Sequence, residues 1–498
     1  MLNELAAVLR RHPDRPAVLA AGPTGRTRTR ATRGELADLA DGYAAALHHH
    51  GLAAGDTLGV AVRPGPRALS VLLAAHRLGL RVAVLDPSAG PDVLTARLAL
   101  ARPALVVADA AAQAVAGWAR PLADRARLAL PRLAELGPVR TVGRRLPGCA
   151  PALRPRSGPT PDRGGPDDDA VIIFTSGTTS RPRAVVHRRA GLDAGMRAVA
   201  DLVRPRAGAP VLGGTFFVLV PALASGAPVA LPARSPRVLA RQVARLCPQA
   251  SYLTPPQLRA LLAQRPRLSG RFYSGSAPVS ATLLDRARRA GAEQAWGVYA
   301  LTELFPAAAV EATEKAAFTG DGDLVGAPLP GVDARVGPDG RLLLTGPGQA
   351  HRYLGEEPHE LVDTGDVARL DGDRIVLAGR SKDMILRGAE NIYPGLYEPA
   401  LHVPGVNLAV LVGVPAGDGD ERLVAVVEPE PGTDPGRLRG ALDPVLARMG
   451  AARPDALLIA PVPTSGRSRT PATRRRRAAL PTVRRARRRR SRSSPPTG

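Results

Sequence analysis

Apolar and polar positions follow two different periods along the first hundred residues. Short apolar runs typical of buried strands occur at 57–62, 81–85 and 104–108. Between them, residues 66–78 and 91–100 repeat apolar positions at helical spacing. Strands that alternate with helices in this way predict βαβ units and a mostly parallel sheet. The chain is therefore expected to begin with an α/β domain.

The next apolar run ends in a loop of small polar residues. Residues 171–174 form the run, and the loop consists of Thr175, Ser176, Gly177, Thr178 and Thr179. Arg183 follows closely and adds positive charge. Glycine allows close approach of a ligand to the backbone, while hydroxyl and amide groups donate hydrogen bonds. These features suit a polyphosphate, although the spacing differs from that of a Walker P-loop. Taken alone, the loop fits an ordinary polar turn equally well.

Two further strand ends carry residues that suit a nucleotide. One apolar strand runs into the small residues Ser274, Gly275, Ser276 and Ala277, where a flat ligand has room beside the backbone. The alternative for this stretch is a turn before the helix 280–290. Another strand is followed by Tyr299, Thr302 and Glu303. An aromatic ring, a hydroxyl and a carboxylate suit base stacking, phosphate contact and Mg²⁺ binding.

The second half of the chain is expected to add a subdomain of short strands and then a smaller domain. Residues 325–381 contain short strands with Gly and Asp turns, including Asp366 in a Thr-Gly-Asp turn that is weak evidence by itself. Strands at 409–414 and 423–429 then alternate with helices at 395–401 and 435–449, which predicts an α+β module.

A charge-free segment at 207–233 raises the question of a membrane span. It contains four prolines and four glycines, which are incompatible with a continuous helix exposed to lipid. We predict no membrane span, and expect core strands and the wall of a pocket instead.

Most of the excess positive charge lies in a tail. The net charge is +24, and the segment from Arg467 to Gly498 contains 13 arginines and no acidic residue, which leaves 24 − 13 = +11 for the rest. No aromatic residue interleaves with these arginines to stack on bases, so nucleic acid is not an expected partner. We interpret residues 476–498 as a disordered tail.

The number of cysteines and the N-terminal residues indicate the cellular compartment in which the protein is expected. Only Cys149 and Cys247 occur, so neither a disulfide framework nor a Cys-rich metal site is expected. An acidic residue precedes the first apolar stretch, which makes a poor signal peptide. We therefore expect a cytoplasmic protein.

Five motifs occur in an order that resembles one family. They are Thr-Ser-Gly-Thr-Thr-Ser-Arg-Pro-Arg (175–183), Ser-Gly-Ser-Ala-Pro (274–278), Tyr-Ala-Leu-Thr-Glu (299–303), Thr-Gly-Asp (364–366), and Gly-Arg-Ser-Lys-Asp (379–383) with Glu-Asn-Ile-Tyr-Pro (390–394). In this order they resemble the ANL superfamily of adenylate-forming enzymes over about residues 1–475. The resemblance implies that a carboxylate attacks the α-phosphate of Mg-ATP, giving acyl-adenylate and pyrophosphate. A thiol then takes the acyl group.

The resemblance also implies residue roles. The loop 175–179 with Arg183 would hold the β- and γ-phosphates, and the turn 274–277 would line the adenine site. Tyr299 would stack on the base, Thr302 would touch the α-phosphate, and Glu303 would ligate Mg²⁺. Asp366 and Arg380 would hold the ribose. The residues expected to act in catalysis are Thr178, Glu303, Lys382 and Arg467. Those expected in the substrate pocket are His187, Phe216 and Phe217.

The implied architecture has two domains and a tail. Residues 1–381 would form the large AMP-binding domain of βαβ subdomains and a short-stranded β subdomain. Residues 382–475 would form a smaller, mobile α+β domain that rotates about a hinge at Lys382 between the two half-reactions. Residues 388–391 would then move in for thioester formation.

Several positions depart from the family pattern. Ser180, Ala184, Ala300 and Ala389 stand where glycine is frequent, and Arg183 stands where lysine is. Arg467 occupies the place of a lysine that bridges the carboxylate and ATP during adenylation. Arginine keeps the charge but is bulkier and planar. Only two of the 68 basic residues are lysine, so we interpret the exchange as compositional drift. An impaired adenylation step is the alternative.

The expected substrate is an apolar, fatty carboxylic acid, because residues 215–226 contain Phe216 and Phe217 and no charged side chain to pair with a substrate amino group. The interval between Glu303 and Thr364 is too short for the insertion of fatty-acyl-AMP ligases, so coenzyme A is the expected acceptor. Residues 82–87 and 302–306 also resemble β-lactone synthetases, which act on hydroxy acids. An alternative of another class is a catalytically impaired homologue whose basic tail binds nucleic acid.

Overall fold

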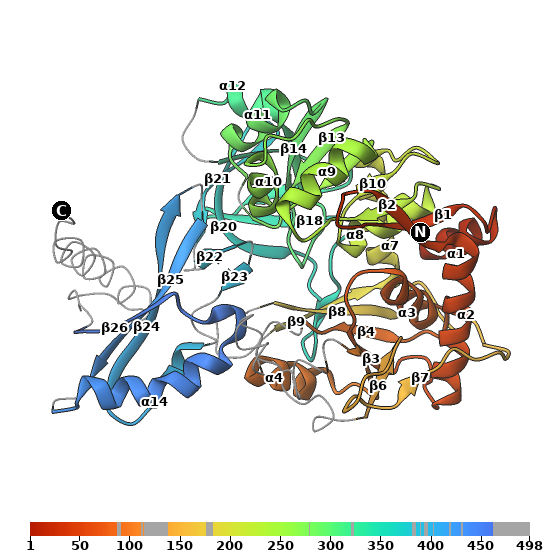
Figure 1. Cartoon of the computed structure of the whole chain (residues 1–498). Helices are drawn as coiled ribbons and strands as arrows, with labels where there is room; N and C mark the ends of the chain where they lie inside the picture. Colours follow the sequence, from red (N-terminus) through yellow and green to blue (C-terminus); the bar gives the residue numbers. More distant parts are fainter. Residues whose placement is uncertain are drawn as a thin grey trace.

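The computed structural model describes residues 1–86, 91–110, 113, 138–175, 183–277, 279–319, 323–380, 385–388, 390–392, 397–401, 403–417, 420–429 and 432–461. It shows an α/β protein with a large N-terminal sheet domain and a smaller C-terminal domain that lies to one side of it (Figure 1). The expected fold class is confirmed.

One sheet of the large domain has eight strands among the described residues, in the order β19-β9-β8-β4-β3-β5-β6-β7. The strands are β3 (Thr57–Ala61), β4 (Arg81–Val84), β5 (Leu105–Asp109), β6 (Val139–Val142), β7 (Ala152–Leu153), β8 (Asp169–Thr175), β9 (Arg183–Arg188) and β19 (Arg352–Tyr353). Strands β3 to β8 pair in parallel, with α3 (Pro66–Arg77) and α4 (Pro91–Ala101) as crossovers. The βαβ prediction is therefore confirmed.

The second sheet has thirteen described strands, in the order β17-β18-β20-β21-β16-β15-β14-β13-β12-β10-β11-β1-β2. The strands are β1 (Pro16–Ala21), β2 (Thr27–Thr32), β10 (Val211–Leu212), β11 (Val229–Leu231), β12 (Ala250–Tyr252), β13 (Arg271–Ser274), β14 (Gln294–Tyr299), β15 (Ala308–Glu311), β16 (Asp323–Pro328), β17 (Asp333–Val336), β18 (Arg341–Thr345), β20 (Val362–Asp371) and β21 (Arg374–Arg380). Strands β10 to β14 are parallel, and those from β15 onward are antiparallel. The antiparallel part corresponds to the expected short-stranded subdomain.

Helices pack against the parallel half of this sheet. They are α9 (Pro236–Leu246), α10 (Pro255–Leu262), α11 (Ala281–Arg289) and α12 (Ala312–Ala317). Their apolar faces bury Leu239, Val243 and Leu258 in a core with Phe272 of β13. Burial of each such side chain contributes about 1.5–3 kcal/mol. The carboxyl ends of β12, β13 and β14 are thereby held in register.

A further group of helices shares one hydrophobic core with residues of both sheets. It contains α1 (Leu2–Arg10), α2 (Arg33–His49), α7 (Arg189–Val203) and α8 (Phe216–Ala224). Helix α2 begins with a capping box in which the side chains of Thr32 and Glu35 each bond the other's backbone N–H. The segment 207–233 contains the expected core strands, β10 and β11, but also helix α8 between them, which the sequence does not predict. Pro221 removes one helical hydrogen bond, but burial of Leu219, Val220 and Leu223 outweighs that loss.

The smaller domain follows the expected α+β pattern. Its described elements are β22 (Ile385–Arg387), β23 (Glu390–Ile392), the 3₁₀ turn η3 (Glu398–Leu401), β24 (Val406–Gly417), β25 (Asp420–Pro429), α14 (Pro435–Arg448), the 3₁₀ turn η4 (Gly450–Ala452) and β26 (Ala456–Ile459). Leu411 and Leu423 pack beneath Leu442 of α14 in a separate core. Within the described ranges, every helix is too short or too polar to cross a membrane.

Candidate active site

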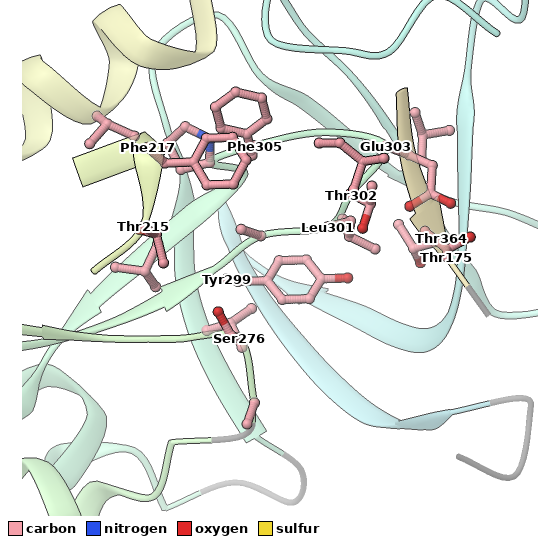
Figure 2. A pocket seen from close by; sticks show the side chains of 18 of the residues that line it. Thr175, Thr215, Phe217, Ser276, Tyr299, Leu301, Thr302, Glu303, Phe305 and Thr364 are labelled. Carbon is pink, nitrogen blue, oxygen red and sulfur yellow. The ribbon is translucent and has the colours of Figure 1, made fainter. Parts of the chain in front are cut away.

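A cavity of about 1320 Å³ lies at the carboxyl ends of strands from both sheets. Strand β8 brings Thr175, β13 leads to Ser276, and β14 ends at Tyr299, all of which line it. Figure 2 shows Phe217 and Phe305 at one end, Glu303 at the other, and Tyr299 between them. The carboxyl ends of strands in open α/β sheets are the usual place for ligands. Three of the strand-end residues that the sequence singles out, Thr175, Ser276 and Tyr299, thus meet in one space.

Tyr299 and Asp366 are joined across two subdomains. The hydroxyl of Tyr299 donates a hydrogen bond of 2.6 Å to Oδ2 of Asp366, whose side chain is only 2% exposed. The Asp366 turn is built locally: Thr364 Oγ1 accepts from the Asp366 N–H and donates to the Leu342 carbonyl. Gly365 has φ +68°, which favours glycine. Thr364 and Gly365 therefore shape the turn, and the Asp366 carboxylate accepts the bond from Tyr299.

Glu303 is held by an aromatic residue from a distant strand. The hydroxyl of Tyr353 in β19 donates to Oε1 of Glu303 at 3.0 Å. The guanidinium of Arg183 lies 4.8 Å from the centre of the Tyr353 ring, within cation–π range. Burial, and then the charge of Glu303, raise the pKa of Tyr353, so the phenol stays protonated and remains a donor. Tyr353 thus connects Arg183 with Glu303.

His187 supports the loop that carries Thr302 and Glu303. Its Nε2 lies 2.7 Å from the Thr302 carbonyl oxygen, which can only accept, so Nε2 carries the proton. The ring is completely buried and meets Phe305 edge-on with centroids 5.5 Å apart. Burial lowers the pKa of His187 to about 4, so the ring is neutral near pH 7. The sequence places His187 in the substrate pocket, whereas the structure places it one layer behind the wall.

The apolar end of the cavity is formed by α7, α8 and the loop after β14. Phe216 and Phe217 line it, and the rings of Phe217 and Phe305 lie 4.3 Å apart. Gly195 of α7 permits this packing, because a Cβ there would lie 2.6 Å from the Phe305 carbonyl oxygen. The expected position of both phenylalanines in a pocket wall agrees with this geometry.

The turn after β13 contributes Ser276 and Ala277 to the lining. Ser276 has φ +68° and shares a hydrogen bond of 2.7 Å with the Tyr252 hydroxyl. Ser274 is fully buried rather than lining the cavity, and a Cβ on Gly275 would lie 2.7 Å from the Val298 carbonyl oxygen. This turn therefore lies tightly against β14.

The remaining expected site residues divide into two groups. The backbone of Arg380 pairs with Asp366 between β20 and β21. The others lie outside the described residues: Ser176, Gly177, Thr178, Thr179, Lys382 and Arg467. Tyr353 and Tyr252 were not anticipated, and no local motif marks either residue.

The AMP-binding enzyme family profile matches residues 5–354. The chain belongs to the AMP-binding enzymes, within the ANL superfamily of adenylate-forming ligases. The resemblance seen in the five motifs is thereby confirmed.

The proteins similar to this chain have several different activities. A feruloyl-CoA synthase of Amycolatopsis sp is 29% identical to this AMP-binding enzyme over 54% of the chain, and the chain spans only 61% of that relative's length. An olefin beta-lactone synthetase of Stenotrophomonas maltophilia is 26% identical over 85% of the chain and 86% of the relative. The amide bond synthetase McbA from Marinactinospora thermotolerans is 22% identical, with a TM-score of 0.76 over 95% of this chain and 99% of that one, and shows the fold.

Proposed function

We propose that this AMP-binding enzyme activates an apolar, fatty carboxylic acid to its acyl-adenylate with ATP and then transfers the acyl group to coenzyme A. The observation that carries the proposal is the large cavity, in which a phenylalanine-lined end lies opposite an end with hydroxyl and carboxylate groups. The apolar end suits a hydrocarbon chain, and the polar end suits a nucleotide.

The proposed roles are those that the family resemblance implies, and they are supported by the cavity lining, which includes Thr175, Arg183, Tyr299, Thr302 and Asp366. Tyr299 flanks the adenine opposite the turn of Ser276 and Ala277, and Asp366 with Arg380 holds the ribose. Thr302 contacts the α-phosphate. The loop of residues 175–179, with Arg183, holds the terminal phosphates, and Arg467 reaches the reacting carboxylate. Such preorganised donors stabilise the charge that develops on the phosphate oxygens.

Mg²⁺ fits Glu303 by the chemistry of its donors. In the described part of the chain, no three His, Cys, Asp or Glu side chains cluster to form a complete metal site. Mg²⁺ usually keeps several waters and takes its other ligands from one or two carboxylates and substrate phosphates, so a single carboxylate is sufficient. When bound, it would supply positive charge against the phosphates. Tyr353 keeps the carboxylate of Glu303 in one orientation.

A second candidate acceptor is a hydroxyl of the substrate itself. The match to the olefin beta-lactone synthetase extends over 85% of this chain, whereas that to the feruloyl-CoA synthase extends over 54%. In this candidate, the hydroxyl oxygen of a β-hydroxy acid attacks the activated carbonyl, AMP leaves, and a four-membered lactone closes. The adenylation step is common to both candidates.

The test is a panel of acids with the purified chain. We expect fatty acids to support exchange of labelled pyrophosphate into ATP, and Glu303→Gln to reduce this exchange at least about a hundredfold. Coenzyme A should then stimulate AMP release. AMP release from β-hydroxy acids alone, without coenzyme A, would favour the lactone candidate. Absence of any carboxylate-dependent exchange would reject both, and Arg467→Lys shows whether that position limits the rate.

A further inference from the structure

A second, smaller cavity of about 90 Å³ lies behind the apolar end of the main one. Helices α1, α3, α7 and α8 surround it, together with strands β4 and β8. Most of its lining is aliphatic: Leu2, Leu72, Leu80, Val82, Leu192 and Val220. It lies outside every role proposed above.

The two cavities share one wall. Phe216, Phe217, Val84 and Ile173 line both of them. Val84 is 37% exposed although it ends a central strand of the eight-stranded sheet, because its free surface faces these cavities. Phe216 and Phe217 are the largest members of the wall, and both belong to the first turn of α8. These two rings are therefore the main partition.

Few polar side chains line the second cavity. Two polar side chains border it, and both are engaged: Arg189 donates to the His76 carbonyl, and His76 Nε2 lies 2.9 Å from Asn3 Oδ1. Arg189 Nε has no partner among the described residues, but it has no accessible surface and cannot meet a ligand there. A space of this kind suits a hydrocarbon segment.

We infer that Phe216 and Phe217 set the longest acyl chain that the enzyme accepts, and that the second cavity is the extension they close off. This inference rests on the proposed activation of a fatty acid. In the main cavity, the chain runs from the reacting end near Thr302 toward Phe217 and Phe305, and its last carbons meet the partition. Removal of one ring joins the two spaces.

The added space can be estimated. At the roughly 30 Å³ that a water-sized group occupies in a liquid, the second cavity holds about three methylene groups. Each newly buried methylene is worth about a fourfold gain in kcat/KM. Because the deleted ring adds its own space, Phe217→Ala should move the preferred chain length upward by at least about three carbons and raise kcat/KM for the longer acids at least about tenfold.

The test measures pyrophosphate exchange with straight-chain acids of increasing length in the wild type, Phe216→Ala and Phe217→Ala. Leu219→Ala is the matched control, because Leu219 lies in the same helix, is fully buried and lines neither cavity. It should leave the preferred length unchanged. Adding Leu192→Phe to Phe217→Ala refills part of the second cavity and should shift the preferred length back toward that of the wild type.

A second experiment separates this inference from the proposed function. It measures acid binding in the absence of ATP through the thermal stabilisation of the protein. If no variant exchanges pyrophosphate, but longer acids stabilise Phe217→Ala than stabilise the wild type, only the proposed activity fails. If the wild type is active and folded Phe216→Ala and Phe217→Ala both keep its length preference, the inference fails. A preference of Phe217→Ala for acids with a second, terminal carboxylate would also overturn it, and so would absence of both exchange and acid binding.

Discussion

The phenol oxygen of Tyr299 lies 2.6 Å from Oδ2 of Asp366, although the two residues are 67 positions apart in the chain. The bond ties the end of β14 to the first half of β20, which belongs to the antiparallel part of the thirteen-stranded sheet. It therefore fixes the tyrosine ring inside the cavity and orients a carboxylate beside it.

Loss of this bond should weaken ATP binding. We predict that Tyr299→Phe raises KM for ATP about tenfold with little change in kcat, since a hydrogen bond to a charged group contributes about 1.5–3 kcal/mol. Tyr273→Phe is the control, because its hydroxyl bonds the Leu202 carbonyl on α7. Kinetics of pyrophosphate exchange at varied ATP give both constants. An unchanged KM for ATP in Tyr299→Phe would contradict the role given to this pair.

The bond between Tyr353 and Glu303 should affect magnesium dependence. Without the hydroxyl, the Glu303 carboxylate is free to rotate, so we predict that Tyr353→Phe requires about five to ten times more Mg²⁺ for half-maximal exchange. Tyr252→Phe, which loses its bond to Ser276, should keep the wild-type Mg²⁺ requirement. Equal Mg²⁺ curves for Tyr353→Phe and the wild type would show that this hydroxyl does not position Glu303.

Most helices and strands, and the strand ends that form the site, can be predicted from the sequence. Apolar runs such as 171–174 identify buried strands because both faces of a parallel sheet are covered, and residues at their carboxyl ends must then lie together. Tyr353 and His187 are different cases. His187 contacts Thr302, which lies 115 positions away in the sequence, and Tyr353 contacts Glu303, which lies 50 positions away. No local sequence pattern predicts either contact. The sequence does not predict helix α8, because the helix is apolar on all sides, shows no helical periodicity and contains Pro221.

An arginine and aspartate cluster should stabilise the eight-stranded sheet. Asp169 accepts two hydrogen bonds from Arg352 at 2.9 and 2.7 Å and one from Arg81 at 3.1 Å. Burial alone would raise the pKa of Asp169, but these hydrogen bonds outweigh it and hold the pKa below its ordinary value. The stabilisation is thus present above about pH 4 and is lost as the pH falls through the lowered pKa.

We predict that Asp169→Asn lowers the free energy of unfolding by about 2–4 kcal/mol, because it leaves two partly buried guanidinium groups without their carboxylate. Asp333→Asn is the control: it breaks an exposed pair with Arg335 and should cost less than about 1 kcal/mol. Urea unfolding at pH 7 measures both values. Similar losses in the two variants would mean that burial adds nothing to the Asp169 cluster.

His76 should make the stability depend on pH. Burial first, and then the charge of Arg189, lower the pKa of His76, while Asp162 and Asp193 oppose them, and the net pKa is about 4. The unfolded chain binds a proton near pH 6.5, so the free energy of unfolding should fall from about pH 6.5 downward and level off near pH 4. Between pH 7 and pH 5 this amounts to at most about 2 kcal/mol. His76→Gln should show a smaller decrease over that interval in urea unfolding, whereas a parallel decrease would assign the pH dependence to other groups.

Lys315 is one of two lysines in a chain with 66 arginines, and it is almost completely buried at 7% exposure. Its Nζ lies 2.6 Å from Asp323 Oδ1 and 2.8 Å from the Leu324 carbonyl oxygen, to which it donates. A compact ammonium fits this site, whereas a planar guanidinium needs more width and brings additional N–H donors that require partners. We predict that Lys315→Arg lowers the free energy of unfolding by about 1–3 kcal/mol. Arg335→Lys on the surface should change it by less than about 0.5 kcal/mol. If Lys315→Arg unfolds at the wild-type urea concentration, the site has room for arginine, and geometry does not explain why lysine is found there.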